Sequence, residues 1–206
     1  MLRFWELTPS PNNIKVRMAL RYKGIAFDAV TVDPADRQPV LDASGQELTP
    51  AIEDRGVALN DSEAILQYLD ASYPDTPRLF PRLRAGRKEC EAWKQQIDAT
   101  VAEHWLPGFL FAIRRRDTLD RESVVRFRDA LGRLDGELGE RPSFKDDPEM
   151  AICDLRVAEW AVYALPGEGL LQRVRLFGKF AEVYGVEPGS LANLERFLGP
   201  WNERLA

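Results

Sequence analysis

The chain has 206 residues, 45% of them hydrophobic, and its 28 basic and 33 acidic side chains give a formal charge of −5. This composition can bury a sizeable core, which excludes a disordered chain, and the length fits one large domain or two small ones. The acidic balance argues against a nucleic-acid binder, because affinity for phosphate backbones requires an excess of Lys and Arg. No apolar run approaches the ~20 residues of a membrane span, and the N-terminus lacks a signal-peptide pattern, so we expect no membrane partner.

Histidine and cysteine are too scarce for several kinds of active site. His104 is the only histidine, and Cys90 and Cys153 are the only cysteines, which excludes a multi-histidine or cysteine-rich metal site. The sequence contains no Gly-x-Ser-x-Gly elbow, no Gly-rich phosphate loop and no Cys-x-x-Cys pair. Two cysteines do not make a disulfide framework, so we expect a protein of the reducing cytoplasm. Any chemistry must rest on hydroxyls, acids, backbone groups or a reactive cosubstrate.

The first 80 residues alternate strand and helix patterns. Strand-like runs are expected at 2–7, 26–32, 51–53 and 57–59. Helical periodicity predicts helices at 12–23, near 39–43 and at 61–73. Gly24 follows the first helix as a stop, and Asn60 or Asp61 would cap the third. The turn 54–56 joins the last two strands as a hairpin, and the order of elements predicts a small α/β domain over 1–80.

A proline-rich hinge at 73–81 separates this part from the remainder, in which strand signals disappear. Amphipathic patterns predict helices at 85–116, 118–138, 151–165, 170–184 and 190–205. We expect a kink in the first of these at Pro107 and Gly108, because proline removes a backbone donor from a helix interior. Residues 85–206 are therefore expected to form an all-helical domain.

The loop between the first strand and the first helix contains Ser10, followed by Pro11, Asn12 and Asn13. The Ser10 hydroxyl and the nearby backbone N–H groups would face the positive end of the helix dipole, a place that suits an anion such as a thiolate. A free thiol has a pKa near ~8.5, and lowering it by about 2 takes ~2.7 kcal/mol of differential stabilisation. A hydroxyl donor and a helix terminus together can supply that stabilisation. The alternative is a loop serine that only caps its own helix.

The second candidate is Thr49 with Pro50, just before the third strand. A proline that enters a strand sits at its start or is cis, and a cis bond exposes the backbone N–H and C=O of the preceding residue. Those groups of Thr49 would pair, as in a β-strand, with an extended peptide ligand. The alternative is a trans bond without this role, because most X-Pro bonds are trans.

The third candidate is the segment 60–63, between the fourth strand and its helix. Ser62 and the first N–H groups of the helix make a carboxylate site, and Asp61 offers a partner for an ammonium group. Together they would hold the charged α-amino acid end of a ligand. An ordinary N-cap is the alternative. The three candidates share one property, since all of them lie at strand ends of one small sheet.

With these motifs in order, the sequence resembles the cytosolic glutathione transferase superfamily, as a serine-type, bacterial-like member. The segments that carry the resemblance are 10–20, 44–52 and 59–69, which read SPNNIKVRMAL, SGQELTPAI and LNDSEAILQYL. The likeness is close over the first 80 residues and weaker beyond them. It implies a thioredoxin-like, glutathione-binding α/β domain followed by an all-helical domain.

The resemblance assigns the three candidates to the binding of glutathione. Ser10 would donate to the glutathione sulfur; omega-like members keep a cysteine there, so its absence disfavours a mixed-disulfide mechanism. Thr49, with Pro50 as the family's cis proline, would pair with the backbone of the glutathione cysteine. Asp61 and Ser62 would bind the γ-glutamyl group, with Asp in place of the commoner Glu. The resemblance also offers three secondary contacts, Asn12, Asn13 and Gln46.

In the helical domain, the family's pocket for the electrophile lies between the first loop and the kinked long helix. The candidates for this pocket are His104, Trp105, Phe109 and Phe111; for each of them, an ordinary core or surface position is the alternative. Ala151 to Asp154 matches the family's Ser/Thr-x-x-Asp box at a helix start. Ala151 replaces the capping hydroxyl, a loss that typically costs ~1 kcal/mol, while Asp154 would keep the reciprocal half of the box.

The resemblance implies a cytoplasmic detoxification enzyme that uses glutathione as cosubstrate, without metal or bound organic cofactor, and conjugates its thiolate to a small apolar electrophile. Related outcomes are peroxide reduction, dehalogenation and cis–trans isomerisation, although isomerase-type members carry Ser-Ser-Cys where this chain has Ser10, Pro11 and Asn12. A homodimer through the last helix of the first domain and the first helix of the second is implied as well. The alternative class is a non-catalytic binding or assembly module of the same fold.

Overall fold

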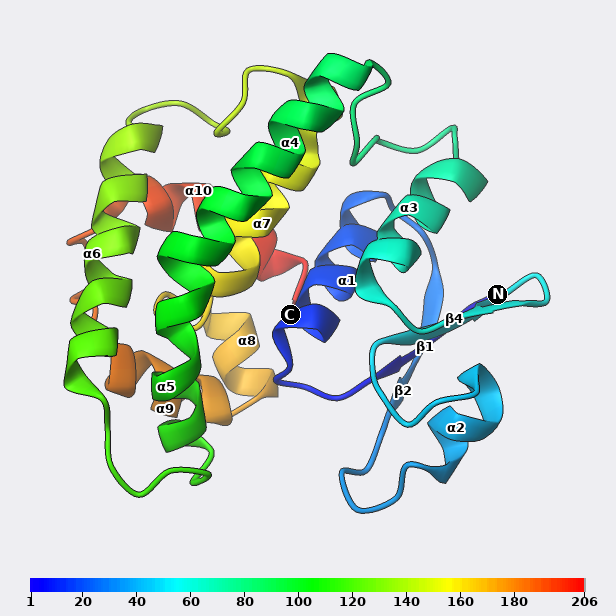
Figure 1. The fold of residues 1–206 in the computed structure, drawn as a ribbon, viewed down its shortest axis with the longest axis horizontal. Coiled ribbons are helices and arrows are strands. Elements are labelled where there is room, and N and C mark those ends of the chain that lie inside the picture. Colours follow the sequence, from blue (N-terminus) through cyan, green and yellow to red (C-terminus); the bar gives the residue numbers. More distant parts are fainter. Residues whose placement is uncertain (206) are drawn as a thin grey trace.

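The computed structural model describes residues 1–205, and a four-stranded mixed sheet organises the beginning of the chain (Figure 1). The strands are β1 (Leu2–Glu6), β2 (Phe27–Thr31), β3 (Ala51–Asp54) and β4 (Val57–Leu59), in the order β2-β1-β3-β4. β1 pairs parallel with β2, and the crossover that a parallel pair requires is the helix α1 (Pro11–Tyr22). β1 and β4 pair antiparallel with β3. The turn between β3 and β4 places Arg55 and Gly56 at φ values of 52° and 81°, as a tight hairpin requires.

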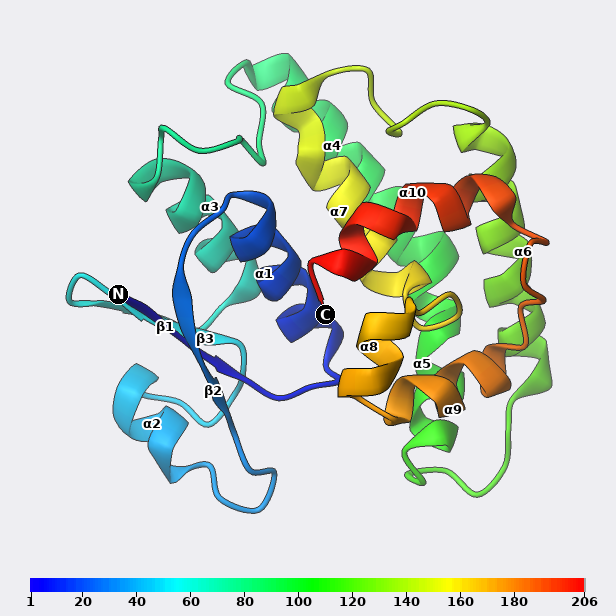
Figure 2. The same cartoon turned by 180° about the vertical axis from the view of Figure 1, so that it is seen from behind.

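Helices cover both faces of this sheet (Figures 1 and 2). α1 and α3 (Ser62–Ser72) lie on the face toward the helical half, where Phe4 of β1 joins the main core. α2 (Gln38–Ser44) covers the other face, where Trp5 packs with Val40 in a smaller cluster. Phe4 and Trp5 serve opposite faces because successive strand residues alternate. The strands and helices expected in this part are confirmed to within about two residues.

The remainder of the described chain is helical. Its helices are α4 (Arg84–Ile97), α5 (Glu103–Ala112), α6 (Arg121–Leu138), α7 (Ala151–Ala161), α8 (Glu168–Arg173), α9 (Leu176–Tyr184) and α10 (Ala192–Glu203). α7 lies between the two halves and packs against both α1 and α4 (Figure 2). The predicted order of an α/β part followed by helices is therefore confirmed. None of the helices within residues 1–205 combines the length and the apolar character needed to cross a bilayer.

The helix boundaries differ from the expected ones in the helical half. The helix expected from 118 begins at Arg121, because the Asp120 side chain accepts a hydrogen bond from the Ser123 N–H at 3.1 Å and caps it there. The single helix expected over 170–184 is divided into α8 and α9, because Val174 between them has an extended backbone. The helix expected over 151–165 ends at Ala161.

The long helix contains an irregularity that was not predicted from the sequence. A π-helical turn occupies Asp98–Ala102, between α4 and α5, while Pro107 lies inside α5. The π-helical residues include no proline or glycine, which are the usual sequence signals of an irregular helix. The kink expected at Pro107 and Gly108 rests on that signal and stays a prediction.

The prediction that Asp154 forms the reciprocal half of a helix-start box is wrong. Asp154 accepts a hydrogen bond from the backbone N–H of Phe144 at 2.8 Å instead, and so holds the loop that precedes α7. The cap is supplied earlier in the chain, where Asp147 accepts from the Glu149 N–H at 2.8 Å and starts a short 3₁₀-helix, Pro148–Met150. This turn leads directly into Ala151, which needs no hydroxyl there.

Asp70, near the end of α3, holds the connection between the two halves. Its carboxylate accepts hydrogen bonds from the backbone N–H groups of Leu79 and Phe80, each at 2.9 Å. The Lys23 ammonium, which is fully buried, lies 2.7 Å from the same carboxylate. The Leu79 carbonyl accepts from the Ile152 N–H of α7 at 2.9 Å. The connecting segment is thus hydrogen-bonded to an element on each side.

Candidate functional site

Ser10 occupies the N-cap position of α1, with an extended backbone at φ −64° and ψ 132°. Its carbonyl accepts from the N–H groups of Asn13 and Ile14, each at 3.0 Å, which begins the helix. Within residues 1–205, however, the Ser10 side chain makes no capping hydrogen bond to α1. The structure therefore does not support the alternative in which the Ser10 hydroxyl caps its own helix. The hydroxyl is available to a ligand at the positive end of α1.

The Thr49–Pro50 bond is cis, as expected, and leads into β3. Asn13, on the first turn of α1, is 1% exposed and donates from Nδ2 to the Thr49 hydroxyl at 3.1 Å. This hydrogen bond joins the segment after β1 to the segment before β3. Both strand ends therefore meet at the same edge of the sheet, as the positions of the motifs predicted.

Asp61 caps α3, because its Oδ1 accepts from the Ala64 N–H at 2.9 Å. The alternative of an ordinary N-cap is thus confirmed for this oxygen, and Asp61 as a whole residue is exposed. Ser62, which is buried, donates from its hydroxyl to Oδ1 of Asn12 at 3.3 Å. The third segment is thereby joined to the first.

Gln46 lies at the rim of the same edge and is half-buried. Its Nε2 donates to the Asn60 carbonyl at 3.3 Å, and Asn60 Nδ2 donates to the Ser44 carbonyl at 3.2 Å. These two bonds connect the loop after α2 with the loop before α3. All the residues predicted for the α/β part are therefore gathered at one edge of the sheet.

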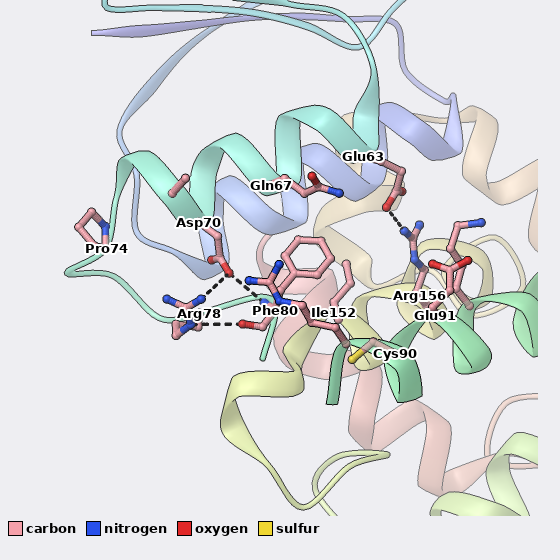
Figure 3. A pocket seen from close by; sticks show the side chains of 13 residues that line it. Glu63, Gln67, Asp70, Pro74, Arg78, Phe80, Cys90, Glu91, Ile152 and Arg156 are labelled. Carbon is pink, nitrogen blue, oxygen red and sulfur yellow. Dashed lines mark hydrogen bonds and ion pairs between the residues drawn. The ribbon is translucent and has the colours of Figure 1, made fainter. Parts of the chain in front are cut away.

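Four charged side chains form a cluster beneath this edge. Lys15 of α1 lies 2.8 Å from Glu63 of α3 and 3.6 Å from Glu159 of α7. Arg156 of α7 pairs with Glu63, as Figure 3 shows, and lies 3.3 Å from Glu159. Two cations balance two anions, so burying the group leaves no net charge. Glu63 directly follows Ser62, which ties the candidate site to the helical half.

The cluster shifts the titration of its two carboxylates in opposite directions. Burial by itself would raise the pKa of Glu63, but hydrogen bonds and charge from Arg156 and Lys15 outweigh it and lower that pKa to about 2. Glu159 is 1% exposed, and its burial raises its pKa despite the nearby Lys15 and Arg156. Glu63 is therefore ionised throughout the neutral range.

On the helical side, aromatic side chains approach the first loop. Trp105 of α5 stacks on Phe109 with ring centres 4.4 Å apart, since residues four apart share a helix face. The ring centres of Tyr163 and Trp105 are 4.9 Å apart. The Tyr163 hydroxyl donates a hydrogen bond to the carbonyl of Pro9, the residue before Ser10. Trp105 and Phe109 are thus linked to the serine loop through Tyr163.

The other two pocket candidates are less clearly placed. His104 and Phe111 are both half-buried on α5. His104 is adjacent to Trp105, and successive helix residues point about 100° apart, so the two side chains leave the helix in different directions. Trp105 is 4% exposed and belongs to the main core, whereas Phe109 is partly buried against that core, and the pocket roles of all four residues stay predictions.

Two features of this region were missed from the sequence. The contact of Tyr163 with Pro9 joins residues 154 positions apart, and the charged cluster draws on three helices. A tyrosine and an arginine in an amphipathic helix carry no local signal of such contacts. Only the helical spacing of Arg156, Glu159 and Tyr163 indicates that they share one face of the segment.

Comparison with known proteins agrees with this arrangement. Residues 6–77 match the family model described as the glutathione S-transferase N-terminal domain. A maleylpyruvate isomerase from Ralstonia is 30% identical over 170 residues, which cover 75% of this chain and 78% of the isomerase. Glutathione S-transferase U22 from Arabidopsis thaliana is 26% identical over 149 residues, which cover 71% of this chain. The chain spans 65% of that relative's length.

A solved structure shares the fold over nearly the whole chain. A rice glutathione transferase, determined in complex with glutathione, has a TM-score of 0.69 at 20% identity, and the match covers 98% of this chain and 85% of the rice chain. The α/β part is therefore thioredoxin-like and the remainder is the helical part of the same fold. The chain belongs to the cytosolic glutathione transferase superfamily.

Proposed function

We propose that the protein is a glutathione transferase in which Ser10 stabilises the glutathione thiolate. The observation that carries the proposal is the meeting of three motif segments at one sheet edge through the Asn13–Thr49 and Ser62–Asn12 hydrogen bonds. Glutathione would lie extended along this edge. The Thr49 backbone would pair with its cysteine, while Asp61 and Ser62 would hold the ammonium and carboxylate of its γ-glutamyl end. Asn12 and Gln46 would make secondary contacts.

Two observations on Ser10 support this role. The Ser10 hydroxyl lies at the N-terminus of α1, where the helix dipole favours negative charge, and it makes no hydrogen bond that caps the helix. A hydrogen bond to a charged acceptor contributes about 1.5–3 kcal/mol, which corresponds to a thiol pKa lowered by roughly 1–2. The thiolate would then attack an apolar electrophile held against Trp105 and Phe109, with His104 as a further lining residue.

One relative of the chain supports a second candidate activity. The Ralstonia relative is named as a maleylpyruvate isomerase, which supports a glutathione-dependent isomerisation by the same thiolate. The Ser10-Pro11-Asn12 sequence lacks the Ser-Ser-Cys of isomerase-type members and speaks against it. Peroxide reduction and dehalogenation would use the same thiolate. The remaining alternative is a non-catalytic module of this fold.

The proposal extends to the assembly and the setting of the protein. A homodimer would form through α3 and α4, which line the same cavity from two sides. The protein would act in the cytoplasm on glutathione and an apolar electrophile. Size-exclusion chromatography with light scattering tests the dimer, and a monomer at micromolar concentration would refute it.

Steady-state assays with glutathione test the activity, using aryl halides, enals, organic peroxides and maleylpyruvate as second substrates. The Ser10→Ala variant should lose roughly ten- to a hundredfold in kcat/KM, and the thiol of bound glutathione should titrate at a pKa higher by about 1–2. Ser190→Ala is the matched control, because Ser190 is exposed in the loop before α10 and bonds only its local backbone. Absence of turnover with every substrate and of retention on immobilised glutathione would favour the non-catalytic module.

A further inference from the structure

The two cysteines of the chain lie in direct contact, although they are 63 positions apart in the sequence. Cys90 belongs to α4 and Cys153 to the first turn of α7, and their sulfur atoms are 3.3 Å apart. The sulfur–sulfur distance in a disulfide is about 2.05 Å, so these two sulfur atoms would have to approach each other by about 1.25 Å to form one. The proposed glutathione chemistry uses neither residue.

Contacts beside the two thiols hold α4 and α7 together. The Trp93 indole of α4 donates to the Cys153 carbonyl at 2.9 Å, which ties the two helices together beside the thiols. Trp93 is 4% exposed and packs against Phe144, with the Lys145 ammonium 4.9 Å above its ring. The contact between the thiols therefore belongs to a packed frame and does not depend on a surface loop.

The two thiols differ in their access to solvent. Cys90 is 8% exposed and lines a cavity of about 590 Å³ between α3, α4 and α7 (Figure 3). Cys153 is fully buried behind it. A small oxidant that enters the cavity therefore meets the Cys90 sulfur first, and in the homodimer proposed through α3 and α4 it would reach the cavity from between the two subunits.

The contact also makes the two thiols chemically different. Cys153 donates its S–H to the Cys90 sulfur, and this hydrogen bond lowers the pKa of Cys90, against its burial and the charges of Glu89 and Asp147. The same bond, together with burial, raises the pKa of Cys153. Cys90 is consequently the better nucleophile of the pair.

We propose that Cys90 and Cys153 form a dithiol that a peroxide oxidises to an intramolecular disulfide between α4 and α7. The Cys90 thiolate attacks the distal oxygen of the peroxide, the O–O bond breaks, and the leaving oxygen takes a proton and departs as water or an alcohol. Cys153 sulfur then attacks the resulting sulfenic sulfur, its proton goes to the departing hydroxide, and water is released. Two thiols are oxidised and one peroxide is reduced, which balances the electrons.

Hydrogen peroxide added to the reduced, desalted full-length protein tests this proposal without any measurement of activity. We expect both thiols to disappear together from a thiol titration performed in denaturant, with the loss of two thiols per peroxide consumed. Intact mass spectrometry should find a monomer lighter by the mass of two hydrogen atoms, and dithiothreitol should restore the original mass. Peptide mapping without reduction should recover the fragments with Cys90 and Cys153 joined.

Two variants separate the roles of the thiols. In Cys153→Ser, Cys90 should be trapped as a sulfenic acid that dimedone labels, because the resolving thiol is gone. In Cys90→Ser, the buried Cys153 should react with peroxide at least tenfold more slowly than the wild-type pair. Cys153→Ala replaces Cys153→Ser if the hydroxyl prevents folding, as circular dichroism would reveal.

Three results would overturn the proposal. The first is a wild-type protein that keeps both thiols at a peroxide concentration that labels Cys90 in Cys153→Ser. The second is a wild-type product that carries added oxygen atoms on Cys90 and a free Cys153. The third is a disulfide between two chains, which would run as a dimer on a non-reducing gel. None of these results bears on the proposed glutathione chemistry.

Discussion

Gly108 of α5 lies so close to Tyr184 of α9 that a Cβ atom at this glycine would stand 2.7 Å from the tyrosine ring. Tyr184 is fully buried and donates from its hydroxyl to the Trp105 carbonyl at 2.6 Å, so the ring has little room to move away. We therefore expect Gly108→Ala to destabilise the protein by about 1–3 kcal/mol through overpacking, although alanine is the better helix former.

Gly136 of α6 provides the matched control for this substitution. It is also helical, but it is exposed and a Cβ there would meet nothing within 4 Å. Gly136→Ala should stabilise the protein by roughly 0.5–1 kcal/mol, because alanine loses less backbone entropy on folding. Urea unfolding of both variants measures the two effects, and equal shifts of the same sign would contradict the packing of α5 on α9.

The charged cluster beneath the sheet edge predicts a strong dependence on Arg156. The Arg156→Met variant removes one of two cations and leaves Glu159 buried with only Lys15, at 3.6 Å, as a partner. Removing one partner of a buried pair typically costs about 3–5 kcal/mol, and we expect a loss of that order in the free energy of unfolding.

The double variant with Glu159→Gln provides the test of mechanism. Because it also removes the unbalanced buried charge, it should recover a substantial part of the stability lost in Arg156→Met. Double-mutant cycles by chemical denaturation yield the coupling energy directly. Strictly additive losses would mean that Arg156 stabilises the fold through packing and not through its charge.

Asp154 predicts a pH dependence of stability with a defined sign. Burial raises its pKa from the usual 3.8 to about 7, only partly opposed by the hydrogen bond from Phe144. Between these values the folded protein retains a proton that the unfolded chain has released, so this group's contribution is complete at low pH and is lost as the pH rises from about 4 to about 7.

The Asp154→Asn variant isolates this contribution, because an amide oxygen still accepts from the Phe144 N–H and does not titrate. We expect the stability of the variant relative to wild type to increase as the pH rises from about 4 to about 7. Urea denaturation of both proteins at several pH values in this interval provides the comparison. A constant difference would show that Asp154 titrates normally in the fold.

Asp61 allows helix capping to be separated from ligand recognition. Asp61→Asn keeps a side-chain oxygen for the Ala64 N–H, and asparagine caps helices about as well as aspartate. We expect this variant to keep wild-type stability and to bind glutathione about tenfold more weakly, because the proposed ammonium contact loses its charge.

Asp61→Ala removes both functions, and should also cost ~1 kcal/mol of stability. Titration calorimetry with glutathione and thermal unfolding of the two variants give the comparison. Unchanged glutathione affinity in Asp61→Asn would leave Asp61 with the capping role alone. That result would not affect the assignment of Ser10.

Most elements of the α/β part depend on local sequence signals. The strands, α1, α3 and the cap at Asp61 were predictable because period, caps and turn residues lie within a few positions of each other. The position of Ser10 was also predictable, but the absence of a capping bond from its hydroxyl was not. That depends on the rotamer the loop imposes.

Contacts between residues far apart in the sequence could not be predicted from local patterns. Asp154 satisfied the local pattern of a helix-start box, yet its carboxylate binds Phe144, ten positions earlier. Tyr163, Arg156 and Cys153 looked like ordinary members of an amphipathic helix. Their partners belong to other helices and loops, and the pattern of a single sequence does not indicate which helices pack together.

The carboxylate of Asp70 receives a lysine from the end of α1 and two backbone N–H groups of the segment that leads to α4. The Leu79 carbonyl of the same segment accepts a hydrogen bond from the Ile152 N–H of α7 at 2.9 Å, so a rotation of the α/β part against the helices would have to break a hydrogen bond on one side of this segment. The two parts are consequently fastened as one rigid piece, and heating should melt them in a single calorimetric transition. In Asp70→Ala, which removes these bonds to the connecting segment, we expect the α/β part and the helical half to unfold in two transitions at different temperatures.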